Sequence, residues 1–176
     1  PAIRSDLERI NTSAQFLLSL VNDILDMSKI QNDKMHIEVA PLRLASLASR
    51  LESMFGIQAQ ERDISLKVVC ETDAVVVADD VRLQQVLANL LSNAFKFTDA
   101  GGTISLSIEE TGCGGDGLEP TYRFSVADDG AGIRPEDLER IFDSFEQAAE
   151  NHRNAQGTGL GLAISSNLVR LMGGKL

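Results

Sequence analysis

The chain has little of several residue types, and each shortage excludes a class of protein. Its two cysteines, Cys70 and Cys113, form no CxxC pair, and only two histidines are present. A structural zinc site or a disulfide framework is therefore not expected, and a reducing cytosol is the default compartment. Lys and Arg number 16 against 26 Asp and Glu, so a net charge of -10 offers no basic surface for nucleic acid or an anionic membrane. No apolar run approaches the roughly 20 residues that span a bilayer, and no signal peptide opens the sequence.

What is present is typical of a globular protein. Hydrophobic residues make up 43% and charged residues 24% of the 176 positions, which argues against wholesale disorder. The length suits one compact domain with a short appendage. Because the chain is acidic, binding a polyanion would need a local device such as backbone N–H groups or a metal ion.

Residues 1–32 have the period of a helix. Ile3, Ile10, Leu17 and Ile24 recur every seven residues, and further apolar residues widen the stripe from position 16 onward. A stripe of this width favours a helix of a four-helix bundle. The alternative is a helix that packs only on its own domain.

The remaining chain mixes helices and strands without strict βαβ alternation, which predicts an α+β fold. We expect strands over residues 35–40, 64–71, 75–79, 103–110 and 121–127, and helices over residues 42–60, 80–97, 135–142 and 160–172. Asp79 and Asp80 are N-cap candidates for the second of these helices, and Gly173 and Gly174 close the last. A GxGxxG match within residues 112–117 leads into a strand rather than a helix, so it predicts a hairpin loop.

Polar residues form one stripe of the helix at 80–97: Arg82, Gln85, Asn89, Asn93 and Lys96. One reading is a solvated face. The other is a nucleotide site, because an amide oxygen is a ligand of the hard type that Mg²⁺ takes beside phosphate oxygens, and a lysine can meet a phosphate as a point charge.

Two glycine-containing segments follow. In VADDGAGI, residues 126–133, a strand ends at a carboxylate that could accept from an adenine amine; the alternative is a simple Asp-Gly turn. In GTGLGLAI, residues 157–164, alternating glycines open an apolar helix whose free N–H groups suit a phosphate; the alternative is a flexible loop before an ordinary helix. No GxxxxGK[ST] pattern occurs, so this is not a P-loop protein.

Together and in this order, these segments resemble the histidine-kinase branch of the GHKL ATP-binding superfamily. NLLSNAFKFT (89–98) is similar to its N box, DDGAGI and GTGLGLAI to its two glycine boxes, and IFDSFEQ (141–147) to its F box. SLVNDILDMSKIQ (19–31) looks like the end of the second dimerisation helix. The resemblance implies a two-layer α/β sandwich over residues 33–176, with a mixed sheet covered by helices, preceded by a dimerisation helix at 1–32.

The resemblance also implies site residues. Asn93 would ligate Mg²⁺, Asn89 would shape the phosphate end, Lys96 would approach the phosphates and Phe97 would line the ATP pocket. Asn89 and Lys96 are the candidate catalytic residues.

Further positions follow from the other boxes. Asp128 would accept from the adenine amine, with Gly130 and Gly132 beside it. Residues 147–156 would form a mobile lid. The remaining candidates would contact or flank the triphosphate: Arg153, Gln156, Gly157, Gly159 and Gly161.

One position separates the branches of the superfamily. The chaperone, mismatch-repair and gyrase-type ATPases carry Glu as a general base where this chain has Asn89, and an amide cannot usefully accept a proton. The resemblance therefore implies transfer of the γ-phosphoryl group to a histidine rather than autonomous hydrolysis. It further implies a homodimer, a response-regulator receiver domain as partner, and a cytoplasmic location, with or without an inner-membrane anchor in the parent. A degenerate binding module and a GHKL-type ATPase are the alternative functions.

The chain also departs from the family pattern. The phosphoacceptor usually lies in an HEhRTP-like segment of a first dimerisation helix, and neither His36 nor His152 has that context. We expect His36 on a strand surface, His152 in the lid and Asp129 facing solvent. The first dimerisation helix and a final strand pair are not found in this sequence, so the chain is expected to bind ATP without phosphorylating itself.

Overall fold

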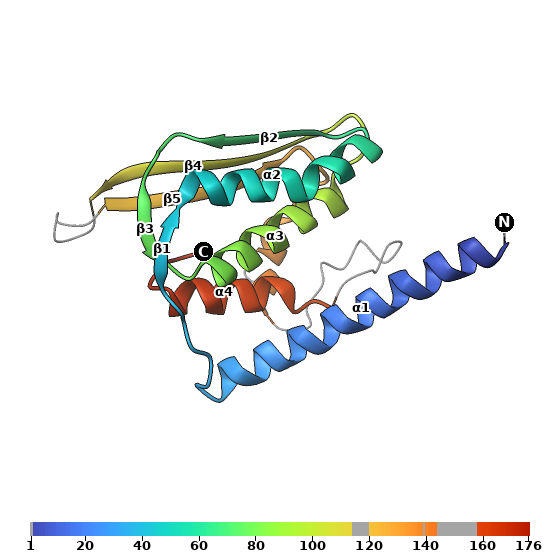
Figure 1. Ribbon diagram of the computed structural model, residues 1–176, viewed down its shortest axis with the longest axis horizontal. Helices are drawn as coiled ribbons and strands as arrows, with labels where there is room; N and C mark the ends of the chain where they lie inside the picture. The colour runs from blue at the N-terminus through green and yellow to red at the C-terminus, as the bar shows by residue number, and fades with distance from the viewer. Residues whose placement is uncertain (1, 114–119, 139, 144–157) are drawn as a thin grey trace.

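The computed structural model describes residues 2–113, 120–138, 140–143 and 158–176. Along the chain the helices and strands follow in a mixed order (Figure 1): α1 (Ala2–Gln31), β1 (Ala40–Arg43), α2 (Leu44–Glu61), β2 (Ser65–Cys70), β3 (Val75–Ala78), α3 (Asp80–Phe97), β4 (Thr103–Cys113), β5 (Pro120–Asp128) and α4 (Gly161–Leu171). Two short 3-10 turns, η1 (Pro135–Asp137) and η2 (Arg140–Phe142), lie between β5 and α4.

The described strands form two sheets. In the larger sheet β4 is central, pairs in parallel with β2 and pairs antiparallel with β5. The smaller sheet pairs β1 antiparallel with β3, with Ala40 opposite Ala78. Alternating sequence explains β4, since Ile104, Leu106 and Ile108 are completely buried and point to one face. The predicted mixed sheet and α+β class are confirmed.

The main core lies between this face and two helices. Helices α2 and α3 lie together over the sheet (Figure 1), and their apolar stripes supply most of the buried residues of the cluster. Phe55 of α2 and Phe95 of α3 stack with ring centroids 5.5 Å apart. Burial of this size holds α3 firmly against the sheet, and the predicted site residues lie on its other side.

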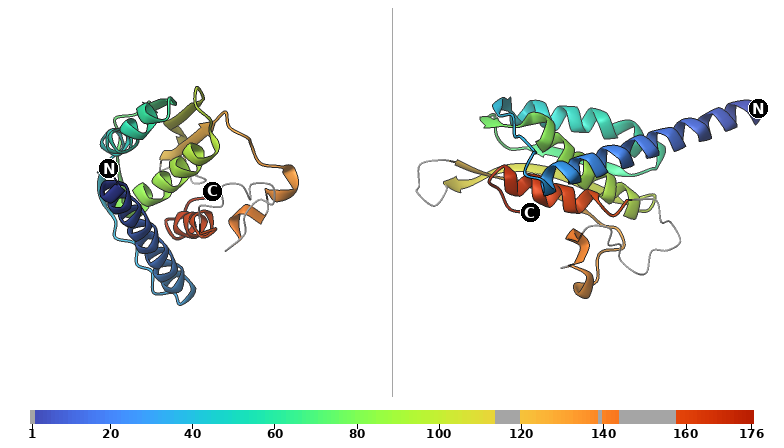
Figure 2. Two further views of the ribbon diagram at one scale, coloured as in Figure 1. Left: turned by 90° about the vertical axis from the view of Figure 1, so that its right-hand side faces the viewer. Right: turned by 90° about the horizontal axis from the view of Figure 1, so that it is seen from below.

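Helices α4 and α1 form a second cluster away from the sheet. Val86 of α3 packs with Leu160, Ile164 and Leu168, and Met27 of α1 is among the partly buried side chains that cover them. Figures 1 and 2 show the C-terminal half of α1 beside α4, while its N-terminal half extends beyond the rest of the chain. The proposed boundary at residue 32 thus falls just after α1, and the division into two domains stays a prediction.

Two sequence-based predictions were wrong. Residues 35–39 form no strand, because the Glu38 N–H donates to Asp79 Oδ2 at 2.8 Å rather than to a neighbouring strand, and pairing starts only at Ala40. His36 is accordingly exposed but lies outside any strand. The helix expected at 135–142 is replaced by η1 and η2, where the Asp137 carboxylate accepts from Arg134 Nε at 2.9 Å.

The other elements agree with prediction to within a few residues. Within the described ranges, no helix is long and apolar enough to cross a bilayer.

Candidate functional site

The start of α3 is fixed by a buried carboxylate. Asp79 is 5% exposed, and its Oδ1 accepts from the Arg82 backbone N–H at 3.0 Å, as predicted for an N-cap. Its Oδ2 accepts from Glu38. Because α3 is capped at this end and packed along one side, the positions of Asn89 and Asn93 further along the helix are fixed.

Asn89 joins α3 to the first turns of α4. Its Nδ2 donates to Ser165 Oγ at 2.8 Å, and Ser165 is 2% exposed. A Cβ added to Gly161 would lie 2.5 Å from Asn89 Oδ1, so a side chain at position 161 would displace this amide. The predicted N-box residue and a predicted glycine-box residue are therefore in direct contact.

Asp128 and Gly130 meet the other end of α3. The Gly130 N–H donates to Asp128 Oδ1 at 3.0 Å, and the Ala131 N–H donates to the Phe97 carbonyl at 3.3 Å. A Cβ on Gly130 would lie 2.3 Å from that same carbonyl oxygen. The absence of a side chain at Gly130 is what lets the turn after β5 approach the end of α3.

The remaining described site residues lie on α3 and in the two glycine-containing segments. Lys96 Nζ lies 5.0 Å from the centroid of the Phe97 ring, and both side chains are exposed. Asn93 is half-buried, and no hydrogen bond joins its side chain to another described residue. Gly132 and Gly159 have φ of 71° and 68°, values that favour glycine. The three candidates Arg153, Gln156 and Gly157 lie outside the described residues, as do the predicted lid and His152.

Several side chains at the site were not among the sequence-based candidates. Ser165 orients Asn89, and no sequence signal identified it beyond its place one turn after Gly161. Thr98 Oγ1 is buried with no hydrogen-bond partner in the described part of the chain. Asp129, expected to face solvent, is exposed, and its carboxylate accepts from the Thr103 N–H at 2.8 Å.

The carboxyl of Asp23, from α1, also reaches the start of α4. Thr158 Oγ1 donates to Asp23 Oδ2 at 3.2 Å and accepts from the Leu160 N–H at 3.1 Å. Burial raises the pKa of Asp23 above its ordinary value of 3.8, the Thr158 hydrogen bond lowers it, and the nearby Asp26 carboxylate raises it. The net effect is a raised pKa for Asp23. The contacts of the ionised carboxylate therefore do not fully offset its loss of water.

The fold and the three converging segments define a nucleotide-binding α+β domain. Residues 78–176, more than half of the chain, match the family described as histidine kinase-, DNA gyrase B-, and HSP90-like ATPases. The chain belongs to this family, and its relatives place it in the histidine-kinase branch.

Three relatives illustrate this. The aerobic respiration control sensor protein ArcB of Escherichia coli K12 is 36% identical over 97% of this chain and 22% of its own length. The hybrid signal transduction histidine kinase D of Dictyostelium discoideum is 35% identical over 98% of this chain and 11% of its own length. The crystal structure of full-length ShkA in complex with AMPPNP is 34% identical, with a TM-score of 0.80, over 97% of this chain and 34% of its own. The chain thus spans less than a quarter of the two curated relatives.

Proposed function

We propose that this chain binds ATP with Mg²⁺ and that, in the intact protein, the γ-phosphoryl group passes to a histidine of the dimerisation domain and then to an aspartate of a response regulator. Membership of the histidine-kinase branch supports the proposal. The observation that carries it is the environment of Asn89. An amide stands where the hydrolytic branches have a carboxylate base, and it is held by Ser165 and packed against Gly161. An amide in this place does not activate water.

The adenine end of the nucleotide is assigned to the turn after β5. Asp128 is exposed at the end of the strand, and among the described residues only the Gly130 N–H engages its carboxylate, at Oδ1. Its Oδ2 is available to accept from an exocyclic amine, which makes a charge-assisted hydrogen bond stronger than a neutral one. Gly132 continues the turn, and the exposed ring of Phe97 would line the pocket nearby.

The phosphate end is assigned to α3 and the start of α4. Gly159 and Gly161 leave backbone N–H groups of the α4 N-terminus open to a phosphate, and Lys96 would approach as a point charge. Arg153, Gln156 and Gly157 complete this proposed set. Positioning and charge neutralisation by these groups would supply most of the catalysis.

The Asn93 side chain is suited to the role of a magnesium ligand. Its half-buried amide makes no hydrogen bond to a described residue, and its oxygen is a neutral donor of the kind that Mg²⁺ accepts beside phosphate oxygens and water. The described residues hold no group of three or more His, Cys, Asp or Glu able to form an acidic metal cage. When bound, Mg²⁺ would neutralise phosphate charge, and Asn93 would fix where it sits.

The exposed apolar side of α1 supports a homodimer. Ile10, Leu17 and Ile24, seven residues apart, are 64%, 58% and 49% exposed, and Val21 is 51% exposed. A stripe this apolar is usually covered in the working assembly, and dimerisation helices in a four-helix bundle would cover it. A receiver domain as partner and a cytoplasmic setting, with or without an inner-membrane anchor, belong to the same proposal.

Incubation with Mg²⁺ and γ-labelled ATP tests the phosphoryl-transfer part. We expect the chain to retain intact ATP and to carry no label on His36 or His152, while the intact protein becomes labelled on a histidine outside residues 1–176. Steady release of labelled phosphate by the chain would instead support an ATPase. Label on either of its own histidines would contradict the assignment of the acceptor.

A further inference from the structure

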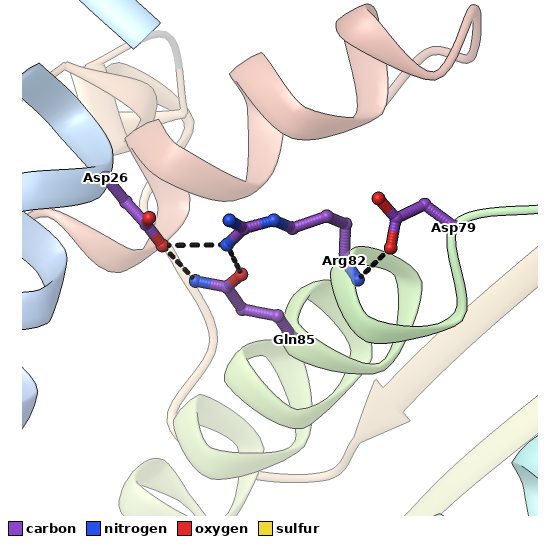
Figure 3. A network of polar contacts seen from close by, with 4 residues as sticks. All are labelled: Asp26, Asp79, Arg82 and Gln85. Carbon is purple, nitrogen blue, oxygen red and sulfur yellow. Dashed lines mark hydrogen bonds and ion pairs between the residues drawn. The ribbon is translucent and has the colours of Figure 1, made fainter. Parts of the chain in front are cut away.

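A polar network fastens α1 to α3 (Figure 3). Asp26 Oδ2 accepts from Arg82 Nη1 at 3.0 Å and from Gln85 Nε2 at 2.9 Å, and Arg82 Nη1 also donates to Gln85 Oε1 at 2.8 Å. Asp26 is 9% exposed. We call these three residues the latch. A carboxylate that is removed from water this far depends on its partners, so the loss of any one of them weakens the docking of α1.

The latch places Asp23, three residues earlier on α1, against the segment that opens α4. The Leu160 N–H donates to Thr158 Oγ1, and the Thr158 hydroxyl donates to Asp23. The carboxylate of Asp23 therefore lies next to the N-terminus of α4. This is the same segment to which the phosphates of a nucleotide are assigned.

A cavity of about 530 Å³ separates α1 from α3 and α4. Asn89, Gly161 and Ser165 line one side, and Asp23 with its neighbours on α1 lines the other. Among the described residues that line it, Asp23 is the only one with a charged side chain. A triphosphate held at Asn89 and Gly161 would therefore face a carboxylate that no basic side chain of the lining offsets.

We propose that Asp23 competes with the nucleotide's phosphates for the start of α4, so that docking of α1 through the latch and binding of a nucleoside triphosphate oppose each other. The inference rests on the proposed function, because it takes the phosphates to lie at Asn89 and Gly161. Coupling between two equilibria is reciprocal. While Asp23 keeps its charge, a bound triphosphate therefore loosens α1, and a change that loosens α1 tightens triphosphate binding.

Two substitutions on adjacent turns of α1 distinguish the effect of the Asp23 charge from the effect of α1 docking. Asp23→Asn removes the competing charge and leaves the latch intact. Asp26→Asn weakens the latch and leaves Asp23 in place. Asp33→Asn is the matched control, because it removes the same charge from an exposed residue just beyond α1.

Isothermal titration of the chain and the three variants with Mg²⁺ and a non-hydrolysable ATP analogue measures the coupling. We expect Asp23→Asn and Asp26→Asn each to bind the analogue at least about fivefold more tightly than the unaltered chain, with Asp33→Asn unchanged. The gain is expected to be smaller for ADP, which lacks the γ-phosphate. Equal affinities for all three variants would overturn the inference. No binding by any of the proteins would overturn the proposed function and the inference with it.

Amide hydrogen exchange gives a second readout that does not depend on affinity. We expect the analogue to speed exchange in the C-terminal half of α1 of the unaltered chain, and Asp26→Asn to speed it without nucleotide. Unchanged exchange in α1 when the analogue is bound would also overturn the inference, and this result remains decisive even where a latch variant folds poorly.

Discussion

Asn89 and Ser165 are 76 positions apart in the sequence and are joined by a 2.8 Å hydrogen bond between α3 and α4. The bond matters because Asn89 has a small neighbour in Gly161 and a buried hydroxyl in Ser165, so its amide is held on two sides. It connects the helix assigned to the metal and phosphates with the helix whose N-terminus is assigned to the same phosphates.

Removal of the hydroxyl should show what this bond contributes. Ser165→Ala leaves the Asn89 amide without this partner, and we expect it to lower the free energy of unfolding by about 1 kcal/mol. Ser166→Ala, the adjacent half-buried position on α4, should change it by less than about 0.5 kcal/mol. Urea denaturation of both variants makes the comparison. Equal effects would mean that the bond adds nothing measurable to stability.

Alanine substitutions at two glycines should have different consequences, one for stability and the other for ATP binding. In Gly130→Ala the new Cβ meets the Phe97 backbone carbonyl at 2.3 Å, which cannot move aside, so we expect a loss of about 2 kcal/mol or more in unfolding free energy. In Gly161→Ala it meets the movable end of Asn89. The fold should then persist, and ATP affinity should fall about fivefold as a contact of Asn89 is lost. Thermal melting and nucleotide titration of both variants check this, and a fully stable Gly130→Ala would contradict the close approach.

The docking of α1 should depend on pH through Asp23. Its pKa is raised when α1 is docked, so the docked form binds the proton more tightly and protonation favours docking. Docking therefore weakens as the pH rises from the ordinary value of 3.8 through the raised pKa, and it is constant above that. Asp23→Asn should protect α1 from amide exchange at neutral pH, and this advantage should vanish as the pH falls toward 3.8. If the extra protection of α1 in Asp23→Asn did not change with pH, this prediction would be contradicted.

Thr98 offers a test of the buried hydroxyl that has no partner. Thr98 is 7% exposed, and its Oγ1 is unpaired among the described residues. Replacement by the similarly shaped Val removes the uncompensated polar atom, so we expect Thr98→Val to raise the free energy of unfolding by about 1 kcal/mol. Denaturant titration measures it. A destabilised variant would show that the hydroxyl has a partner in solution.

The helices and strands that were predicted correctly from the sequence are those determined by nearby residues. The Asp79 cap, the apolar stripe of α3 and the alternation of β4 lie within a few residues of the structure they produce. Helix α3 has the predicted bounds, and β4 begins as predicted at Thr103 but continues three residues further, to Cys113. The strand expected at 35–40 was wrong because a distant group, the Asp79 carboxylate, takes the Glu38 N–H. Pattern reasoning has no access to such a competitor.

The site shows the same division. The resemblance assigned Asn89, Asp128 and Gly161 by motif, and the structure brings Asn89 to Gly161 and the turn after Asp128 to the end of α3. Ser165 and the latch were missed, because they depend on how α3, α4 and α1 pack together. The contact of Asp26 with Arg82, 56 positions away, has no signature in the neighbourhood of either residue.

The most direct test of ATP binding at this site is a calorimetric titration of the chain with Mg²⁺ and a non-hydrolysable ATP analogue, compared between Asp128→Asn and Asp129→Asn. Both variants lose one negative charge at neighbouring exposed positions, but only Asp128 is assigned to the adenine amine. The account predicts Mg²⁺-dependent binding by the unaltered chain and by Asp129→Asn, and a loss of at least about tenfold in Asp128→Asn, which corresponds to one charge-assisted hydrogen bond. Equal affinities for the two variants, or no binding by the unaltered chain, would contradict it.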